Sequence, residues 1–257
     1  TAIERKLFSV KLHSWWSELW RALLWGAAAG AAVSAVFLFA GARLTVSALI
    51  MLWSIALVLS LFRVRFLNFA YAAGAIGLAQ AVLAATGAGE ELAALSETAA
   101  AAAREVEQVH LPSLFLLAGV IHAAEAVLAR FASARAAAPQ YFDGKRGKAV
   151  GGYRIHARWP LPLLLLVPLA PALGGMPETL PWPTLFGMLD EASFGPPGEP
   201  AGWTVAAFPV LAGFHSLSLA QGPWMKARFL FWPLAAVGLA AAGAGIALAF
   251  VPAWWSA

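Results

Sequence analysis

The side chains best able to do chemistry in this sequence are a histidine and a carboxylate, three residues apart in an apolar stretch. His122 and Glu125 lie in the run VIHAAE, and a spacing of three places both on one face of a helix. A carboxyl group inside a membrane costs roughly several kcal/mol when it is charged and unpaired, so Glu125 is expected to face the interior and find a partner. His215, followed by Ser216 and Ser218 in another apolar stretch, is the candidate partner.

Three interpretations of this trio are open. The side chains would form a proton relay, bind a metal ion, or make polar contacts between helices, which contribute about 0.6 kcal/mol each on average. Polar packing is the simplest of the three. The sequence therefore predicts no catalytic residue and no cofactor, with His122, Glu125 and His215 only as candidate metal ligands. The chain contains no Cys, which excludes thiolate metal sites, disulfides and cysteine nucleophiles.

The composition indicates that lipid surrounds the elements that position these side chains. The 257 residues are 61% hydrophobic and 12% charged, with a mean hydropathy of +0.75. A soluble domain is usually about 45–50% apolar and about 25% charged. So few charges cannot coat a globule of this size, which favours an integral membrane protein over a soluble enzyme. The net charge of +4 is too small to indicate a nucleic-acid partner.

Windows of about 20 apolar residues predict an all-α fold, a polytopic transmembrane bundle of about seven helices in one domain, residues 1–257. The predicted spans are residues 22–41, 46–62, 66–86, 112–133, 159–175, 203–221 and 229–251. The fifth span contains Pro160, Pro162, Pro168 and Pro171, so we expect it to be broken or re-entrant. Residues 86–111 are typical of a surface helix and residues 175–202 of an irregular cap.

Two glycines in the first span, Gly26 and Gly30, form a GxxxG pair. Small residues at this spacing let two transmembrane helices approach closely. The pair therefore predicts a helix–helix contact.

The distribution of charge predicts an orientation in the plasma membrane. Cations are retained on the cytoplasmic side of spans, and 15 of the 17 Lys and Arg residues fall on one side of the predicted spans. Only Arg43 and Arg104 fall on the other side, which also holds nine of the 13 acidic residues. We therefore expect a multi-pass protein with a cytoplasmic N-terminus and an external C-terminus for this chain.

The longest cytoplasmic connection, residues 134–158, has the composition of a partner-binding loop. It carries six positive charges against Asp143 alone, together with aromatic side chains of the kind that dominate interfaces. The predicted partner-binding residues are Tyr141, Phe142, Lys145, Arg146, Lys148 and Tyr153. A loop that only fixed topology would need the charges and not the aromatics.

Two stretches carry a resemblance to a known family. One is ERKLF at residues 4–8, with LFRVRFLNFAY at 61–71; the other is HAAE at 122–125, with FDGKRGKAVGGY at 142–153 and WPLP at 159–162. Their order and spacing resemble the membrane region of MinJ-like proteins, which are polytopic and typically end in a PDZ domain. The chain has no PDZ-length segment after Val251 and lacks the family's additional first span, so we expect either a fragment or a likeness confined to the membrane module.

The resemblance implies a non-enzymatic membrane scaffold or adaptor in division-site selection. Its partners would be the bilayer and proteins of the MinD and DivIVA types. The alternative, from a different class, is a small transporter or an intramembrane metal or proton-relay protein built around His122, Glu125 and His215. A discontinuous fifth span is consistent with that alternative, because broken helices line many transport sites.

Overall fold

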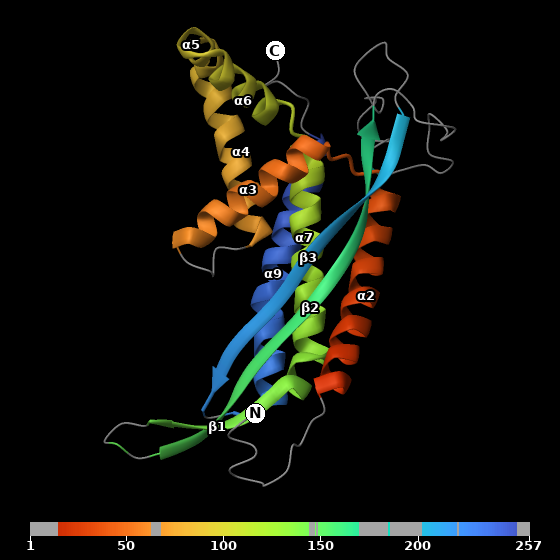
Figure 1. Ribbon diagram of the computed structural model, residues 1–257, viewed down its shortest axis with the longest axis vertical. Helices are drawn as coiled ribbons and strands as arrows, with labels where there is room; N and C mark the ends of the chain where they lie inside the picture. The colour runs from red at the N-terminus through yellow and green to blue at the C-terminus, as the bar shows by residue number, and fades with distance from the viewer. Residues whose placement is uncertain are drawn as a thin grey trace. The chain divides into compact units, whose positions relative to one another are not determined.

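The computed structural model describes residues 15–62, 68–143, 147, 149–169, 185, 202–219 and 221–250. Their elements, in chain order, are α2 (Trp15–Ala40), α3 (Val46–Phe62), α4 (Phe69–Thr86), α5 (Ala88–Leu95), α6 (Glu97–Glu107), α7 (Leu111–Phe131), η2 (Ser133–Ala136), β1 (Ala137–Asp143), β2 (Ala149–Leu169), β3 (Gly202–Ser218) and α9 (Pro223–Phe250) (Figure 1).

The chain forms two compact units, which are described separately. The ribbon unit comprises residues 1–34, 121–164 and 207–238, and the helical unit comprises residues 35–120, 165–206 and 239–257.

Four helices, α2, α4, α7 and α9, are long and apolar enough to cross a membrane, and α3 is apolar but shorter. In α2, α4 and α9 the protein itself covers little of this apolar surface. Of the most apolar 18-residue stretch of each helix, 22% is buried in α2, 22% in α4 and 11% in α9, against 56% in α7. Exposed apolar surface on this scale requires another apolar environment, so these helices are compatible with membrane insertion.

The prediction of an all-α bundle with seven helical spans is corrected by a three-stranded sheet. Residues 159–169 of the fifth predicted span lie in β2 and residues 203–218 of the sixth lie in β3. The sheet has the strand order β1-β2-β3. Proline inside a helix removes a donor and clashes with the preceding turn, whereas at the edge of a strand it is tolerated. Hydropathy alone does not separate an apolar strand from an apolar helix. The other five predicted spans overlap α2, α3, α4, α7 and α9.

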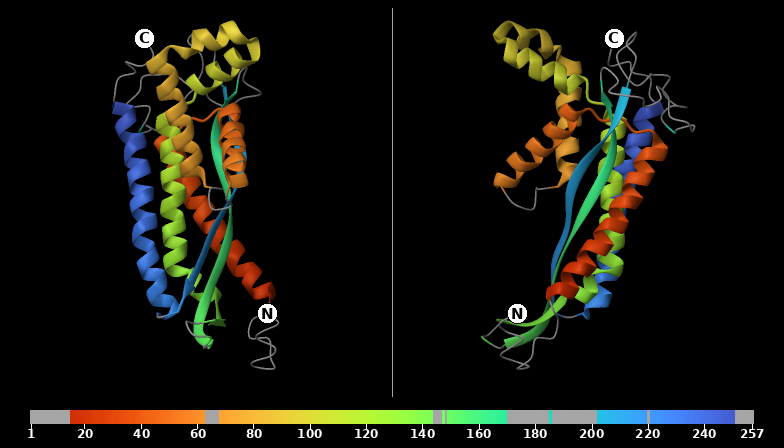
Figure 2. Two further views of the ribbon diagram at one scale, coloured as in Figure 1. Left: turned by 90° about the vertical axis from the view of Figure 1, so that its left-hand side faces the viewer. Right: turned by 45° about the vertical axis from the view of Figure 1, so that its right-hand side comes forward.

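Alternation along β2 and β3 gives the sheet one covered face and one open face. From Ile155 to Leu163 the odd-numbered residues of β2 are buried, while Arg154, His156 and Arg158 are exposed. In β3 the even-numbered residues from 208 to 212 are buried and the odd-numbered ones are exposed. The two strands run in opposite directions, side by side (Figures 1 and 2).

The prediction that residues 134–158 form a loop is also corrected, because the described residues of this stretch lie in η2, β1 and the first part of β2. β1 and β2 pair antiparallel, with Tyr141 opposite Gly151 and Pro139 opposite Tyr153. The predicted surface helix at 86–111 is present as α5 and α6. Most of the predicted cap at 175–202 lies outside the described residues.

The helical unit is held together by close helix contacts and by polar caps. The Gln80 amide donates to the Glu107 carbonyl oxygen at 2.7 Å, which caps the end of α6. The buried Ser113 hydroxyl accepts from the Arg43 N–H at 2.7 Å and lies 2.7 Å from His110 Nδ1. These bonds satisfy backbone groups that lie at helix ends.

Candidate functional site

The two glycines of α2 contact a strand, not another helix, which corrects the predicted helix–helix contact. A Cβ added at Gly26 would lie 2.1 Å from the Pro160 carbonyl oxygen, and one at Gly30 would lie 2.7 Å from that of Pro162. Neither distance is possible for a real side chain. The glycines therefore let the edge of β2 lie directly against the backbone of α2, beside which it runs in Figure 2.

The edge of β2 that faces α2 has few free backbone donors. Backbone groups of alternate residues point to the same edge of a strand, so Pro160, Pro162 and Leu164 share this edge. The two prolines have no N–H. The Leu164 N–H donates to the Ser34 hydroxyl at 2.9 Å, and that hydroxyl donates to the Gly30 carbonyl oxygen at 2.7 Å. Gly26, Gly30 and Ser34, each four residues apart, thus form one stripe of α2 that covers this edge.

The outer edge of β3 is covered by the carboxylate of Glu125, one of the three predicted candidate site residues. Glu125 on α7 accepts a hydrogen bond from the backbone N–H of Gly213. Pro209 shares the edge of Gly213 and, like the prolines of β2, contributes no donor. A helix side chain and a proline therefore reduce the unpaired donors of this edge as well.

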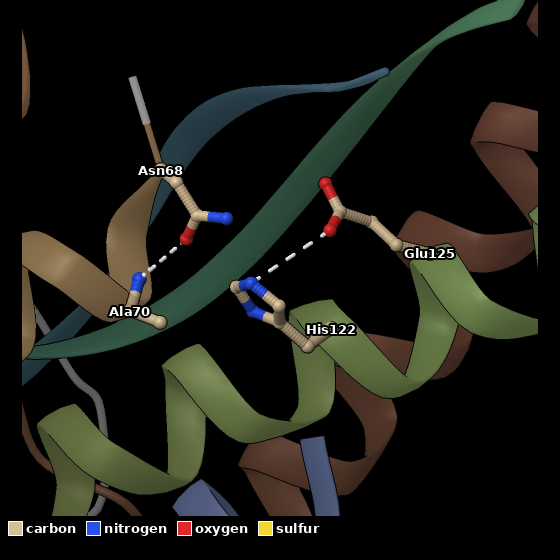
Figure 3. A network of polar contacts seen from close by, with 4 residues as sticks. All are labelled: Asn68, Ala70, His122 and Glu125. Atoms are coloured by element: carbon tan, nitrogen blue, oxygen red, sulfur yellow. Dashed lines mark hydrogen bonds and ion pairs between the residues drawn. The ribbon is translucent and has the colours of Figure 1, made fainter. Parts of the chain in front are cut away.

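His122 lies one turn before Glu125 on α7. Its Nε2 is 3.9 Å from Glu125 Oε2, and the histidine side chain is almost completely buried. Figure 3 shows this pair, and also the cap of α4, in which Asn68 Oδ1 accepts from the Ala70 N–H at 2.8 Å. The predicted pairing of His122 with Glu125 on one helix face is thus present.

The third member of the predicted trio, His215, has different neighbours. It accepts a hydrogen bond from Arg154 Nε at 3.3 Å, and its ring centroid is 5.6 Å from that of His156. Within the described part of the chain, no three His, Asp or Glu side chains gather in a way that could hold a metal ion. His215 thus belongs to a cluster with Arg154, His156 and Arg158 on the open face of the sheet, which we call the cationic cluster because its two arginines are positively charged.

The predicted partner-binding aromatics divide between the two faces of the β1–β2 hairpin. Tyr141 and Tyr153 lie on one face, because cross-strand partners share a face and Tyr141 is opposite Gly151. Tyr141 is 67% exposed and Tyr153 is 38% exposed. Phe142 lies on the other face, where its ring is close to Gly152. Lys145, Arg146 and Lys148, predicted to bind the partner, lie outside the described residues.

Comparisons with known proteins yield no matching family, no matching curated protein and no matching solved structure. The likeness to MinJ-like membrane regions therefore remains a prediction.

The cationic cluster was not predicted, although the sequence carries a signal for it. In YRIHAR the basic residues Arg154, His156 and Arg158 alternate with apolar residues, which is the period of two expected of a half-buried strand. The adjacent apolar run masked this period, because it was long enough to be taken for a helical span.

Proposed function

We propose that this chain is a non-enzymatic membrane scaffold that docks a cytoplasmic protein on the β1–β2 hairpin. The observation that carries the proposal is the pair of exposed tyrosines, Tyr141 and Tyr153, on one face of this hairpin. Ile155, two residues further on that face, is fully buried. The face that packs against protein at Ile155 thus continues as an uncovered aromatic surface.

Tyrosine suits this role because its ring buries a large apolar area while its hydroxyl keeps a hydrogen-bonding partner. The positive residues that connect β1 and β2 in the sequence, Lys145, Arg146 and Lys148, favour an acidic partner. The resemblance to MinJ-like proteins supplies a specific version of the proposal, in which MinD- or DivIVA-type proteins dock here during division-site selection.

The proposed orientation keeps the hairpin in the cytoplasm of a multi-pass plasma-membrane protein. The orientation is inferred from the side of the membrane on which each cationic connection lies. A strand that crosses the bilayer changes this side just as a helix does, so the predicted distribution of cations stays the same. β2 has an apolar run at residues 159–169 and β3 has one at 203–214, each long enough for the roughly 9–11 residues of a tilted transmembrane strand. The covered edges of the ribbon support this crossing, because an open strand edge is not tolerated in hydrocarbon.

The proposal is tested by affinity capture from detergent extracts of cells that express the tagged chain. Replacing Tyr141 and Tyr153 together by Ala is expected to abolish capture of a specific partner while membrane insertion stays normal. Val150→Ala is the matched control, since Val150 is 40% exposed on the opposite face. Equal recovery of the partner by the double variant and the parent would contradict docking on this face.

The rival function is an intramembrane proton relay, and one observation favours it. His122 and Glu125 are within 3.9 Å of each other, and both are largely shielded from solvent. The bond from Gly213 to Glu125 gives the carboxylate a structural role that needs no transport. The two functions are distinguished by the Glu125 variants discussed below.

A further inference from the structure

The open face of the β2–β3 ribbon carries a cationic cluster at one end. Arg154, His156 and Arg158 are alternate residues of β2, about 7 Å apart along the strand, and His215 faces them from β3. All four side chains are exposed. Within the described part of the chain, none of the four is paired with a carboxylate. The cluster is therefore a concentration of positive charge that the described residues leave without a counter-ion.

Beyond the cluster the same face becomes apolar. Pro162 and Leu164 continue it on β2, and Leu211 and Pro209 continue it on β3. Leu164 is 56% exposed and Leu211 is 57% exposed. One continuous face thus has a cationic end and an apolar extension.

We propose that this face binds an anionic phospholipid, with the headgroup phosphate at Arg154, Arg158 and His215 and the acyl chains along Leu164 and Leu211. Guanidinium groups stay charged at any physiological pH and bind phosphate oxygens through a planar fork of donors. A lipid satisfies both halves of the face at once, whereas a soluble phosphate would leave the apolar half uncovered. A metal cation would be repelled by the two guanidinium groups beside the histidines.

Two local features support the assignment. The Cγ atom of Arg158 would be 3.8 Å from a Cβ added at Gly213, so the stem of this exposed arginine lies close to β3 on the open face. The pKa of His156 is lowered first by partial desolvation of its exposed side chain and then by electrostatic repulsion from Arg158, His215 and Arg154. The electrostatic part of this effect, which comes from the neighbouring basic side chains, is one that a bound phosphate would offset.

The test uses the full chain, purified in a neutral detergent and titrated with dioctanoyl-phosphatidylglycerol. A ligand that binds only the folded state raises the melting temperature with its concentration. We expect phosphatidylglycerol to raise it well above the effect of phosphatidylcholine with the same chains. Arg154→Gln with Arg158→Gln should weaken the apparent affinity about tenfold or more, since two charge-assisted contacts are lost.

The matched control is Arg135→Gln with Arg228→Gln, which removes two exposed arginines elsewhere in the ribbon unit. This control should change the affinity less than about twofold, as expected of screened surface charge. If the Gln double variant is not folded, Arg154→Lys with Arg158→Lys replaces it, with a smaller loss expected because charge is kept and the fork is lost.

Three results would overturn the proposal: equal stabilisation by phosphatidylcholine, equal loss in the control variant, or full stabilisation by inorganic phosphate alone. The last would identify a soluble anion as the ligand. These variants do not touch Tyr141 or Tyr153, which lie on the opposite face, so failure of lipid binding and failure of partner docking are separate outcomes.

Discussion

The carboxylate of Glu125 accepts a hydrogen bond from the backbone N–H of Gly213. A helix side chain thus pairs with the outer edge of a strand, at a point where the strand has no neighbouring strand among the described residues. Ser34 does the same for Leu164 on the other edge. The two relationships explain how a two-stranded ribbon with apolar side chains can lie among apolar helices without leaving these donors unpaired.

Glu125 variants test this role. Glu125→Gln keeps an acceptor for the Gly213 N–H and should unfold near the temperature of the parent. Glu125→Leu leaves that donor unpaired, which costs about 1–3 kcal/mol, so its melting temperature in detergent should be clearly lower. If Glu125 made only a weak polar contact between helices, the melting temperatures of the Gln and Leu variants would be nearly equal. A Gln variant that folds and inserts normally but loses function would support the proton relay instead.

Gly26 and Gly30 should tolerate no side chain. Alanine at either position forces the β2 backbone away from α2, and overpacking of this kind costs about 1–3 kcal/mol. Gly26→Ala should be the more destabilising, since its Cβ would lie 2.1 Å from a backbone oxygen against 2.7 Å at Gly30. Gly74→Ala is the control, because a Cβ there meets nothing within 4 Å. Equal melting temperatures of the Gly26→Ala and Gly74→Ala variants would contradict the close contact between α2 and β2.

Proton uptake by His156 on unfolding should lower the stability of the folded chain in mild acid. Because its pKa in the folded chain is lowered from the ordinary 6.5, the unfolded chain takes up a proton before the folded chain does. The contribution of neutral His156 to the stability of the folded chain is complete above pH 6.5. It is lost as the pH falls toward the pKa of His156 in the folded chain. Melting temperatures measured between pH 7.5 and 5.5 should therefore fall less steeply for His156→Gln than for the parent. Anionic lipid should also reduce the slope, and a slope unchanged by both would contradict this account.

Single cysteines test the proposed orientation, because the chain has no native Cys. Ser96→Cys and Ser193→Cys should react with an impermeant thiol reagent added to intact cells. Ala149→Cys, in the proposed cytoplasmic hairpin, should react only after the cells are opened. External labelling of Ala149→Cys would reverse the proposed sidedness.

Much of the helical part of the fold was predictable, since long apolar runs such as that of α9 have few alternatives to a helix. The ribbon was not predicted, because its strands are as apolar as helices and pair with segments far along the chain. Prolines spaced by two, at Pro160 and Pro162, were the available signal, since they share one strand edge but suit no helix interior. The partner of Glu125 was not predictable either, because it is a backbone N–H and leaves no mark in the sequence.

We propose that β2 and β3 cross the bilayer as a strand ribbon with one face toward lipid. Spin labels placed singly at residues 159–164 and 207–212, in liposomes, measure it through their accessibility to dissolved oxygen, which concentrates in the hydrocarbon. In a strand ribbon the accessibility should vary with a period of two, with maxima at even-numbered residues of β2 and odd-numbered residues of β3, where the side chains are the more exposed. A period near 3.6 in either segment, or labels that are uniformly accessible to a water-soluble reagent, would contradict it.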